Sequence, residues 1–358
     1  MSSNKRTLRS SRTTAPLTAP ATVIPSPVTF NPSTLTQSQE TIQLFAPGSK
    51  LPGLTTSDLT LLHKKQRQLE QNSASIVTTL YPSPHIPTAL SAILIFAQYE
   101  ASTAVCIDSS GWLLTCSNCI TDNLSKWTAP GDAHKRKWLL YHTGQAVQAE
   151  CRAWDPICDL ALLKIIAMER PISKANEIGI PSFAFMSLST EPLAPKELIV
   201  CIGQPGRDDL EAGGNKRTKY NLVEISEGTF RGMVLGADPH DNSQIGALMH
   251  DAWTYWGHSG APLLRRDDGT LLGLHSSWDD QTAMRHGIPR VAIEEFLKEH
   301  LPGDPVAVMG GRRGAGRAEM SNKRKLLDGD GEAGGGGNGL AGEKSGAAFV
   351  DLTMSSPG

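Results

Sequence analysis

The residues best suited to chemistry lie in three short segments of the chain. They are Gly111 to Ile120 (GWLLTCSNCI), Asp155 to Ile165 (DPICDLALLKI) and Asp251 to Leu264 (DAWTYWGHSGAPLL). The third segment holds a serine, Ser259, within a Gly-His-Ser-Gly run. A serine hydroxyl is a poor nucleophile until a neighbouring base removes its proton, and the same base must later protonate the leaving group. The first question is therefore whether the three segments supply such a base.

In order and spacing, the three segments resemble those of the trypsin-like serine proteases, especially their HtrA (DegP-like) branch. Leu114 and Thr115 match the family's L-T-x-x-H stretch, and Asn118 falls on the position of the catalytic histidine. The D-L-A-L-L-K run resembles the segment that begins with the triad aspartate, and G-H-S-G-A-P-L resembles the segment around the nucleophile. The resemblance implies that Asp159 is the triad aspartate and Ser259 the nucleophile.

The same resemblance implies an oxyanion hole and a substrate pocket. Gly257 and Ser259 fall on the two residues whose N–H groups form the oxyanion hole. Gly257 suits this role because a residue without a Cβ permits the backbone geometry that turns its N–H toward a developing oxyanion. Trp253 falls where the base of the primary specificity pocket begins, and it either fills that pocket or belongs to the core. Ser276 ends a run, GTLLGLHS, that resembles the strand lining the substrate cleft.

Asn118 decides the expected activity. A carboxamide has no pKa in the working range, so it neither accepts the serine proton nor returns it. We therefore expect a pseudoprotease that acts as a protein-binding module, with a protein or peptide partner in the cleft and Asp159 hydrogen-bonded to Asn118. The alternative is an active HtrA-like serine endopeptidase with a nonstandard base.

Four other side chains near these segments are candidates for that base or for another nucleophile. His258 adjoins Ser259, but neighbouring side chains in such a turn diverge. His275 and His250 are interpreted as packed or solvent-facing residues. Cys119 would be nucleophilic only as a stabilised thiolate, and a buried thiol at a strand end is the simpler interpretation.

The elements that must position these residues are short apolar runs broken by Gly, Pro, Asp and Asn. They begin at about residue 75 and include SIVTTLY, AILIFAQ, TAVCID, WLLTC, KWLLYHT, LALLKII, FAFMSL, ELIVCIG, TFRGMVLG, APLL and TLLGLHS. Such runs, almost without helix, indicate an all-β fold. The resemblance makes it a trypsin-like double β-barrel over residues 75–301, with barrels at about 75–185 and 186–290 and a C-terminal helix over 292–300.

The flanks of this region have a different composition. Residues 1–56 are dense in Ser, Thr and Pro, so they cannot bury enough apolar surface to offset backbone ordering, and we predict disorder there. Ser57 and Asp58 are typical of a helix cap and predict a helical lead-in over residues 57–74. Residues 302–358 form a Gly-rich basic tail that is also predicted to be disordered.

Short motifs in the flanks bear on partners and location. Phe349 to Ser356 (FVDLTMSS) resembles a SUMO-interacting motif, which implies binding of SUMO through Phe349 to Thr353 by strand addition. Lys323 to Lys325 resembles a nuclear import signal, or is only a solvated basic patch. Together the two motifs favour the nucleus or cytoplasm. The basic, acid-free start from Lys5 to Arg12 suits a mitochondrial presequence, which is the alternative.

Composition excludes several other classes of protein. A net charge of -2 over 358 residues gives no field that favours nucleic acid or an anionic membrane. No run reaches the roughly 18 apolar residues of a membrane span. Six cysteines in so long a chain do not make a disulfide framework. Cys116 and Cys119 form one CxxC without a second pair, so we expect no metal and no cofactor, and a redox or zinc protein is the minor alternative. HtrA-like proteases usually carry a PDZ module after the protease domain, and we recognise none in this sequence.

Overall fold

The computed structural model describes residues 41–79, 85–98, 101–170, 182–208 and 216–302. The SUMO-type motif, the basic import-type motif and the basic start of the chain lie outside these residues. No helix within them is long and apolar enough to cross a membrane. In chain order the elements are β1 (Gln43–Phe45), α1 (Thr56–Thr79), α2 (His85–Ser91), β2 (Ile93–Phe96), β3 (Thr103–Cys106), β4 (Trp112–Cys116), the 3₁₀ helix η1 (Ser117–Cys119), α3 (Leu124–Trp127), the 3₁₀ helix η2 (Ala133–Lys135), β5 (Arg136–Tyr141), β6 (Ala146–Asp155), β7 (Leu160–Glu169), β8 (Leu198–Gly203), β9 (Glu224–Met233), β10 (Leu248–His250), β11 (Pro262–Arg265), β12 (Leu271–Trp278), β13 (Arg285–Pro289) and α4 (Arg290–His300).

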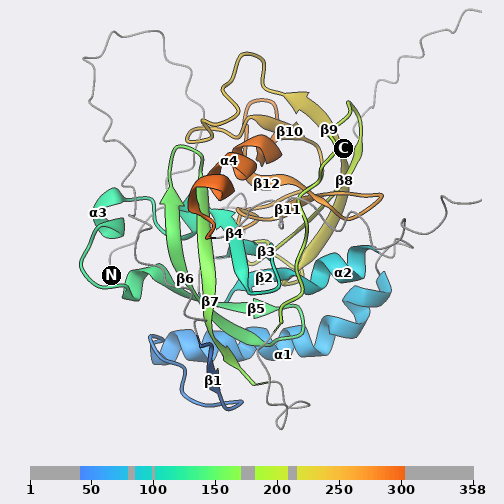
Figure 1. Ribbon diagram of the computed structural model, residues 1–358. Coiled ribbons are helices and arrows are strands. Elements are labelled where there is room, and N and C mark those ends of the chain that lie inside the picture. The colour runs from blue at the N-terminus through green and yellow to red at the C-terminus, as the bar shows by residue number, and fades with distance from the viewer. Residues whose placement is uncertain (1–40, 80–84, 99–100, 171–181, 209–215, 303–358) are drawn as a thin grey trace, which may run out of the picture. The chain divides into compact units, whose positions relative to one another are not determined.

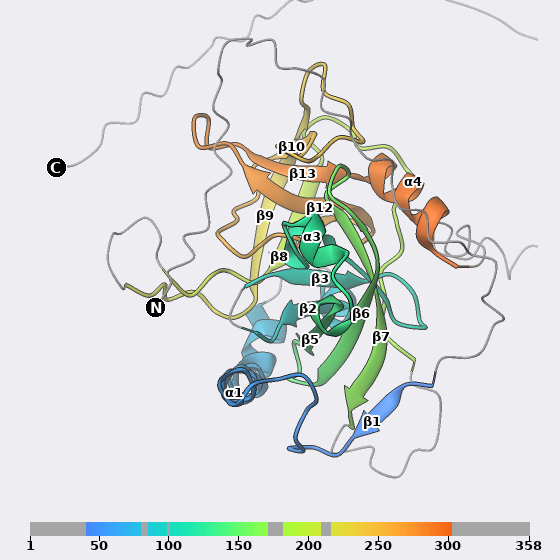
Figure 2. The ribbon, with the colours of Figure 1, turned by 90° about the vertical axis from the view of Figure 1, so that its left-hand side faces the viewer.

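The first barrel is formed by β2 to β7. Its strands follow the order β7-β4-β3-β2-β5-β6, all antiparallel, and the pairing of β6 with β7 closes the ring. β1 adds to β7 from outside the ring in a parallel pair, with Gln43 opposite Ala167 (Figures 1 and 2). The segment between β3 and β4 is a tight turn, and the η1 turn directly follows β4.

The second barrel is formed by β8 to β13. It is closed in the order β10-β13-β12-β11-β8-β9, and its pairs are also antiparallel. β13 lies between β10 and β12 and pairs with both, so it brings residues of these two separate segments next to each other. The expected all-β fold, a trypsin-like double β-barrel, is confirmed.

A continuous apolar core joins the two barrels. β3 is buried at all four of its positions, as is β2. Successive side chains of a strand point to opposite faces, so burial at every position means that both faces of these strands are covered. Leu94 of the first barrel and Leu274 of the second belong to the same cluster of buried side chains. This shared core holds the two barrels together at their boundary.

The helices lie outside the barrels. α1 begins with a reciprocal cap, in which the N–H of Asp58 donates to Thr55 Oγ1 and the N–H of Thr55 donates to Asp58 Oδ2. Leu62, Lys65 and Leu69 recur at helical spacing on its buried face. Near the C-terminal end of the described residues α4 packs against β7 of the first barrel and β12 and β13 of the second (Figure 2).

Before residue 80 the structure differs from the sequence expectations at three places. A strand, β1, and the buried side chain of Leu51 lie in the segment where disorder was predicted. The cap residue of α1 is Thr55, two residues before the predicted Ser57, because the Thr55 hydroxyl accepts the free N–H of Asp58. α1 also continues to Thr79, through residues assigned to a β-type run, because extending an existing helix costs less than nucleating a new element.

Candidate active site

Asp159 lies in the turn between β6 and β7. Asp155 shapes the turn, because its Oδ1 accepts the N–H groups of Ile157 and Cys158 at 2.7 and 3.0 Å. Asp159 itself has a φ of 54°, in the left-handed region that Asp tolerates better than most residues. The residue is completely buried. A buried carboxylate needs hydrogen-bond donors, and the turn aims this one toward η1.

Those donors include Ser117 at the start of η1. Its hydroxyl donates to Asp159 Oδ1 at 2.7 Å, and its N–H donates to the carbonyl oxygen of Asp159 at 3.1 Å. The partner expected from the sequence was Asn118, the next residue along. Asn118 instead accepts a weak bond from the Cys119 thiol at 3.4 Å. The turn that carries Asn118 is thus bonded to Asp159 through Ser117, the residue before it.

Two tryptophans brace this turn from outside. Trp154 Nε1 donates to the carbonyl of Ser117 at 3.1 Å. Its ring stacks on that of Trp127, with ring centroids 5.6 Å apart, and Lys135 Nζ lies 4.7 Å from the centre of the Trp127 ring. A stacked aromatic pair with a hydrogen bond to the backbone restricts how far η1 can move.

Cys116 and Cys119 are buried, and neither is in a disulfide. Cys116 Sγ donates to the carbonyl of His275 at 3.4 Å, and Cys119 Sγ donates to the carbonyl of Ser259 at 3.5 Å. Burial raises the pKa of Cys119 to about 11, so the group is a thiol and a poor nucleophile at neutral pH. No group of three His, Cys, Asp or Glu side chains able to hold a metal ion occurs among the described residues.

Ser259 lies in a turn that only glycine allows at its start. Gly257 has a φ of +97°, and a Cβ there would lie 2.7 Å from the carbonyl oxygen of Gln204 and would clash with Ala101. The carbonyl of Trp256 accepts the N–H of Gly206. Because the C=O and N–H of a trans peptide point in opposite directions, the N–H of Gly257 is turned away from Gly206. Gly257 and Ser259 both line the same cavity.

The first barrel holds this serine turn from the other side. The carbonyl of Ser259 accepts the N–H of Thr103 at 3.0 Å in addition to the Cys119 thiol. A Cβ on Gly260, which has a φ of +81°, would clash with the Thr103 carbonyl. The serine segment and the L-T-C-S-N-C segment are therefore packed together at the boundary between the barrels.

The imidazole of His258 is bonded to the backbone of Tyr255 and not to Ser259. Its Nδ1 lies 3.0 Å from the carbonyl oxygen and 3.1 Å from the backbone nitrogen of Tyr255. The ring is buried against Gly203, where a Cβ would lie 2.7 Å from its Cδ2. Burial lowers the pKa of His258 to about 4. The expectation that the two neighbouring side chains diverge agrees with this geometry.

His250 and His275 form a buried pair behind the serine. His250 Nε2 and His275 Nδ1 lie 3.1 Å apart, and the rings meet edge to face. Burial lowers the pKa of His250 to about 3 and holds that of His275 well below its usual value. Both imidazoles are therefore neutral at neutral pH.

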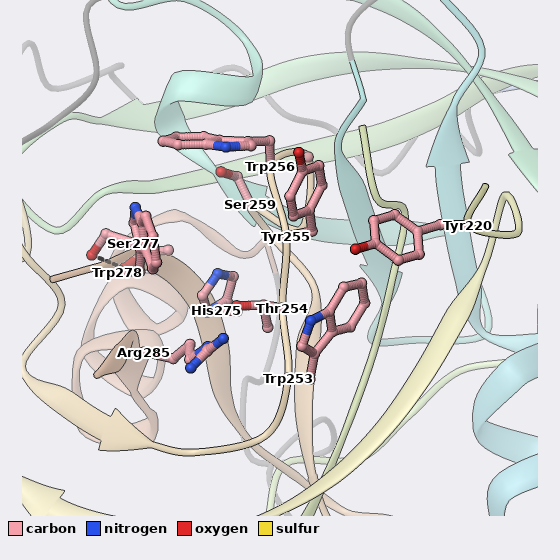
Figure 3. A pocket seen from close by; sticks show the side chains of 12 residues that line it. Tyr220, Trp253, Thr254, Tyr255, Trp256, Ser259, His275, Ser277, Trp278 and Arg285 are labelled. Atoms are coloured by element: carbon pink, nitrogen blue, oxygen red, sulfur yellow. Dashed lines mark hydrogen bonds between the residues drawn. The ribbon is translucent and has the colours of Figure 1, made fainter. Parts of the chain in front are cut away.

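A cavity of about 420 Å³ opens beside Ser259 (Figure 3). Its walls are aromatic, formed by Tyr220, Trp253, Tyr255, Trp256 and Trp278. The rings of Tyr220 and Trp253 lie 4.9 Å apart, and those of Trp256 and Trp278 lie 6.0 Å apart. Trp253 is therefore a wall of the pocket, which leaves space beside it, and Ser276 from β12 lines the same space.

The structure brings most of the predicted site residues together. Ser259, Gly257, Trp253 and Ser276 share the cavity, and Asn118 is the neighbour of Cys119, whose thiol reaches Ser259. Sequence reasoning missed three contributors. They are Ser117, the aromatic walls of the cavity other than Trp253, and Arg285 at the start of β13. The dense W-T-Y-W run before the serine was the available signal for the aromatic walls, whereas nothing in the sequence marked Arg285.

Two closed antiparallel barrels, with a buried aspartate on one and a glycine-flanked serine on the other, are the architecture of the chymotrypsin-fold serine proteases. Residues 102–274 match the family model of the trypsin-like peptidase domain. This range contains Asn118, Asp159 and Ser259. The match supports placing the double barrel in that family. No curated protein matches the chain significantly.

Proposed function

We propose that this chain is a trypsin-like protease homologue that binds a peptide segment of a partner protein in its cleft without cleaving it by a triad. The proposal depends on Asn118, which falls on the histidine position by resemblance to the family. It is supported by the adjacent residue, Ser117, whose hydroxyl is bonded to Asp159. The aspartate is retained and buried, but the residue that should relay the serine proton has no basic nitrogen.

The chemical consequence is large. In triads of this type the loss of one coupled member lowers turnover by about a million-fold. Substrate binding and the oxyanion hole then leave a rate enhancement of only about 10³ to 10⁴ over the uncatalysed reaction in water. The neighbouring imidazoles are poorly suited to replace the missing base. His258 is bonded to the Tyr255 backbone, and His275 faces His250.

The binding half of the proposal is supported by the open cleft. A cavity of about 420 Å³ lies beside Ser259, and its aromatic walls offer apolar area to a side chain that enters it. The left-handed Gly257 keeps a backbone turn of the type that an oxyanion hole requires. These features suit a site that still holds a peptide.

The test uses a fluorophosphonate probe, which reacts only with an activated serine. We expect no labelling of the wild-type chain, labelling of Asn118→His, and none of the matched double variant Asn118→His with Ser259→Ala. Wild-type labelling that Ser259→Ala abolishes, together with cleavage of casein, would overturn the proposal. Failure of Asn118→His to label would contradict the inference that only the base is missing.

The second candidate is an active serine endopeptidase with a nonstandard base. It is favoured by the same Gly257 turn and open cavity, which a protein with no remaining chemistry has less reason to keep. Wild-type labelling in the assay above would select it.

Within the family, we infer the HtrA-like branch from the G-H-S-G-A-P-L and D-L-A-L-L-K runs. We further propose a nuclear location and binding of SUMO through Phe349 to Thr353, supported by the short apolar core of that segment. Titration of isotope-labelled SUMO with the full chain and with Val350→Ala/Leu352→Ala tests the second point. Equal spectral changes with both chains would overturn it.

A further inference from the structure

The cavity beside Ser259 carries a single ionised side chain. Apart from the aromatic walls, its lining consists of glycine, threonine, serines, His275 and Arg285, with no acidic residue among the described ones. The histidine is neutral at neutral pH because burial lowers its pKa. The charge of this space at neutral pH therefore comes from Arg285.

Strand register places Arg285 at this point. It is the first residue of β13, opposite His250 on β10 and Trp278 on β12. Paired residues on adjacent antiparallel strands present their side chains to the same face of the sheet. Figure 3 shows Arg285 beside His275, facing the same space as Trp253. Strand pairing therefore positions Arg285 at the cavity.

Arg285 is incompletely satisfied by the part of the chain that the structure describes. Its Nη1 donates to the carbonyl of Ala283 at 2.9 Å, and its Nε is shielded from solvent without a hydrogen-bond partner there. No carboxylate forms an ion pair with it among the described residues, whereas Arg231 and Arg290 each have one. A shielded N–H without an acceptor is costly, and an anion that reaches the guanidinium would offset that cost. Its planar donors match a carboxylate in particular.

Without Arg285, the aromatic walls would favour a positively charged ligand. Rings around a cavity attract ammonium groups through their faces. Arg285 reverses that preference, because a second cation entering the cavity would face it with no intervening carboxylate among the described residues. The walls then serve the apolar part of the ligand, and the charge selects its head group.

We propose that this cavity binds a carboxylate of the peptide ligand, with Arg285 as the residue that selects it. The inference rests on the proposed peptide-binding function of the cleft. Two sources fit the chemistry, namely a glutamate or aspartate side chain and the C-terminal carboxylate of a chain. The experiment separates them.

The experiment measures binding of fluorescein-labelled hexaalanine peptides to the full chain by anisotropy. One set has blocked termini and a central glutamate, glutamine or lysine, and a second set has no charged side chain and ends in either a free carboxylate or an amide. We expect a carboxylate peptide to bind at least about tenfold more tightly than its neutral counterpart, as for hydrogen bonds to charged groups. Which set shows the preference identifies the source.

Variants assign the effect to Arg285. Arg285→Met should remove the preference, while Lys298→Met, which removes an exposed cation on α4, should keep it. Melting temperatures of both variants check that they are folded. If Arg285→Met does not fold, loss of the wild-type preference between 50 mM and 500 mM salt supplies the second measurement, because salt screens a charge-based preference.

The outcomes separate the two proposals. Equal binding of carboxylate and neutral peptides overturns the assignment to Arg285 and leaves the peptide-binding cleft standing. Tighter binding of the lysine peptide also overturns the assignment. Absence of binding by every peptide overturns both this inference and the peptide-binding half of the proposed function. A preference that persists in folded Arg285→Met shows that another group selects the carboxylate, and overturns the role of Arg285.

Discussion

The Ser117 hydroxyl lies 2.7 Å from Oδ1 of Asp159, and it joins a turn of the first barrel to a carboxylate that is completely buried. The two residues are also joined through their backbones, since the N–H of Ser117 donates to the Asp159 carbonyl at 3.1 Å. Asp159 is therefore held by the residue that precedes Asn118, so this contact needs no histidine at position 118.

Ser117→Ala should destabilise the protein by about 1 to 3 kcal/mol, because it leaves Asp159 Oδ1 without this donor in a buried site. Urea unfolding measures the change. Ser125→Ala, at an exposed position in α3, is the matched control and should alter the free energy of unfolding by less than about 0.5 kcal/mol. Equal losses in the two variants would contradict the importance of the Ser117 bond.

Gly257→Ala should damage the serine turn. Its φ of +97° already disfavours a side chain by about 1 to 2 kcal/mol, and the new Cβ would also meet Ala101 and the Gln204 carbonyl. Gly236→Ala is the control, because Gly236 has a similar φ of +75° but no atom within 4 Å of the added Cβ. Thermal unfolding should show a clearly larger loss for Gly257→Ala. A similar loss in both would mean that backbone conformation alone matters.

The free energy of unfolding should fall as the pH drops below about 6.5, the usual pKa of histidine. The pKa values of His250 and His258 are lowered to about 3 and about 4, so between these values and 6.5 the unfolded chain binds more protons than the folded one. Stability therefore rises with pH across this window, by about 1.4 kcal/mol per pH unit for each histidine.

His250→Gln tests that pH dependence. Urea unfolding at several pH values between 7 and 5 should give a slope smaller than that of the wild type by about one histidine's contribution. The variant must first be shown to fold at pH 7. A slope identical to that of the wild type would show that the buried His250 does not resist protonation.

Lys65→Met should weaken the packing of α1 on the first barrel. Lys65 Nζ is buried and donates to the carbonyls of Phe96 and Gln98, both at 2.8 Å, so its removal leaves two carbonyls without this donor. We expect a loss of about 1 to 3 kcal/mol in the free energy of unfolding at pH 6. Lys64→Met, at the adjacent exposed position, should have little effect.

The difference between wild type and Lys65→Met should also depend on pH. Burial and the nearby charge of Arg207 lower the pKa of Lys65 to about 7, whereas a lysine in the unfolded chain titrates near 10.5. The unfolded wild type therefore binds the extra proton between these values, and its stability should rise with pH relative to the variant. A difference that is constant from pH 6 to 9 would contradict the lowered pKa.

Much of the fold could be predicted from local sequence. Runs such as TAVC and WLLTC are too short and too rich in strand-forming residues for helices, and they became β3 and β4. β1 could not be predicted, because its three residues are stabilised by pairing with β7, more than 100 positions further along the chain. The cap residue of α1 could not be chosen from the sequence, because both Thr55 and Ser57 offer a hydroxyl. The folded turn shows that the Thr55 hydroxyl accepts the N–H of Asp58.

By itself the sequence determined which chemical groups are present at the site. It showed Ser259 in its glycine turn, Asp159 before an apolar strand, and no histidine at position 118, because these depend on residue type and short spacing. Only the tertiary structure decided that Ser117 bonds Asp159 and that Arg285 faces the cavity with His275 and Trp278. Those relationships arise from barrel closure and strand register, which bring together side chains that no local pattern connects.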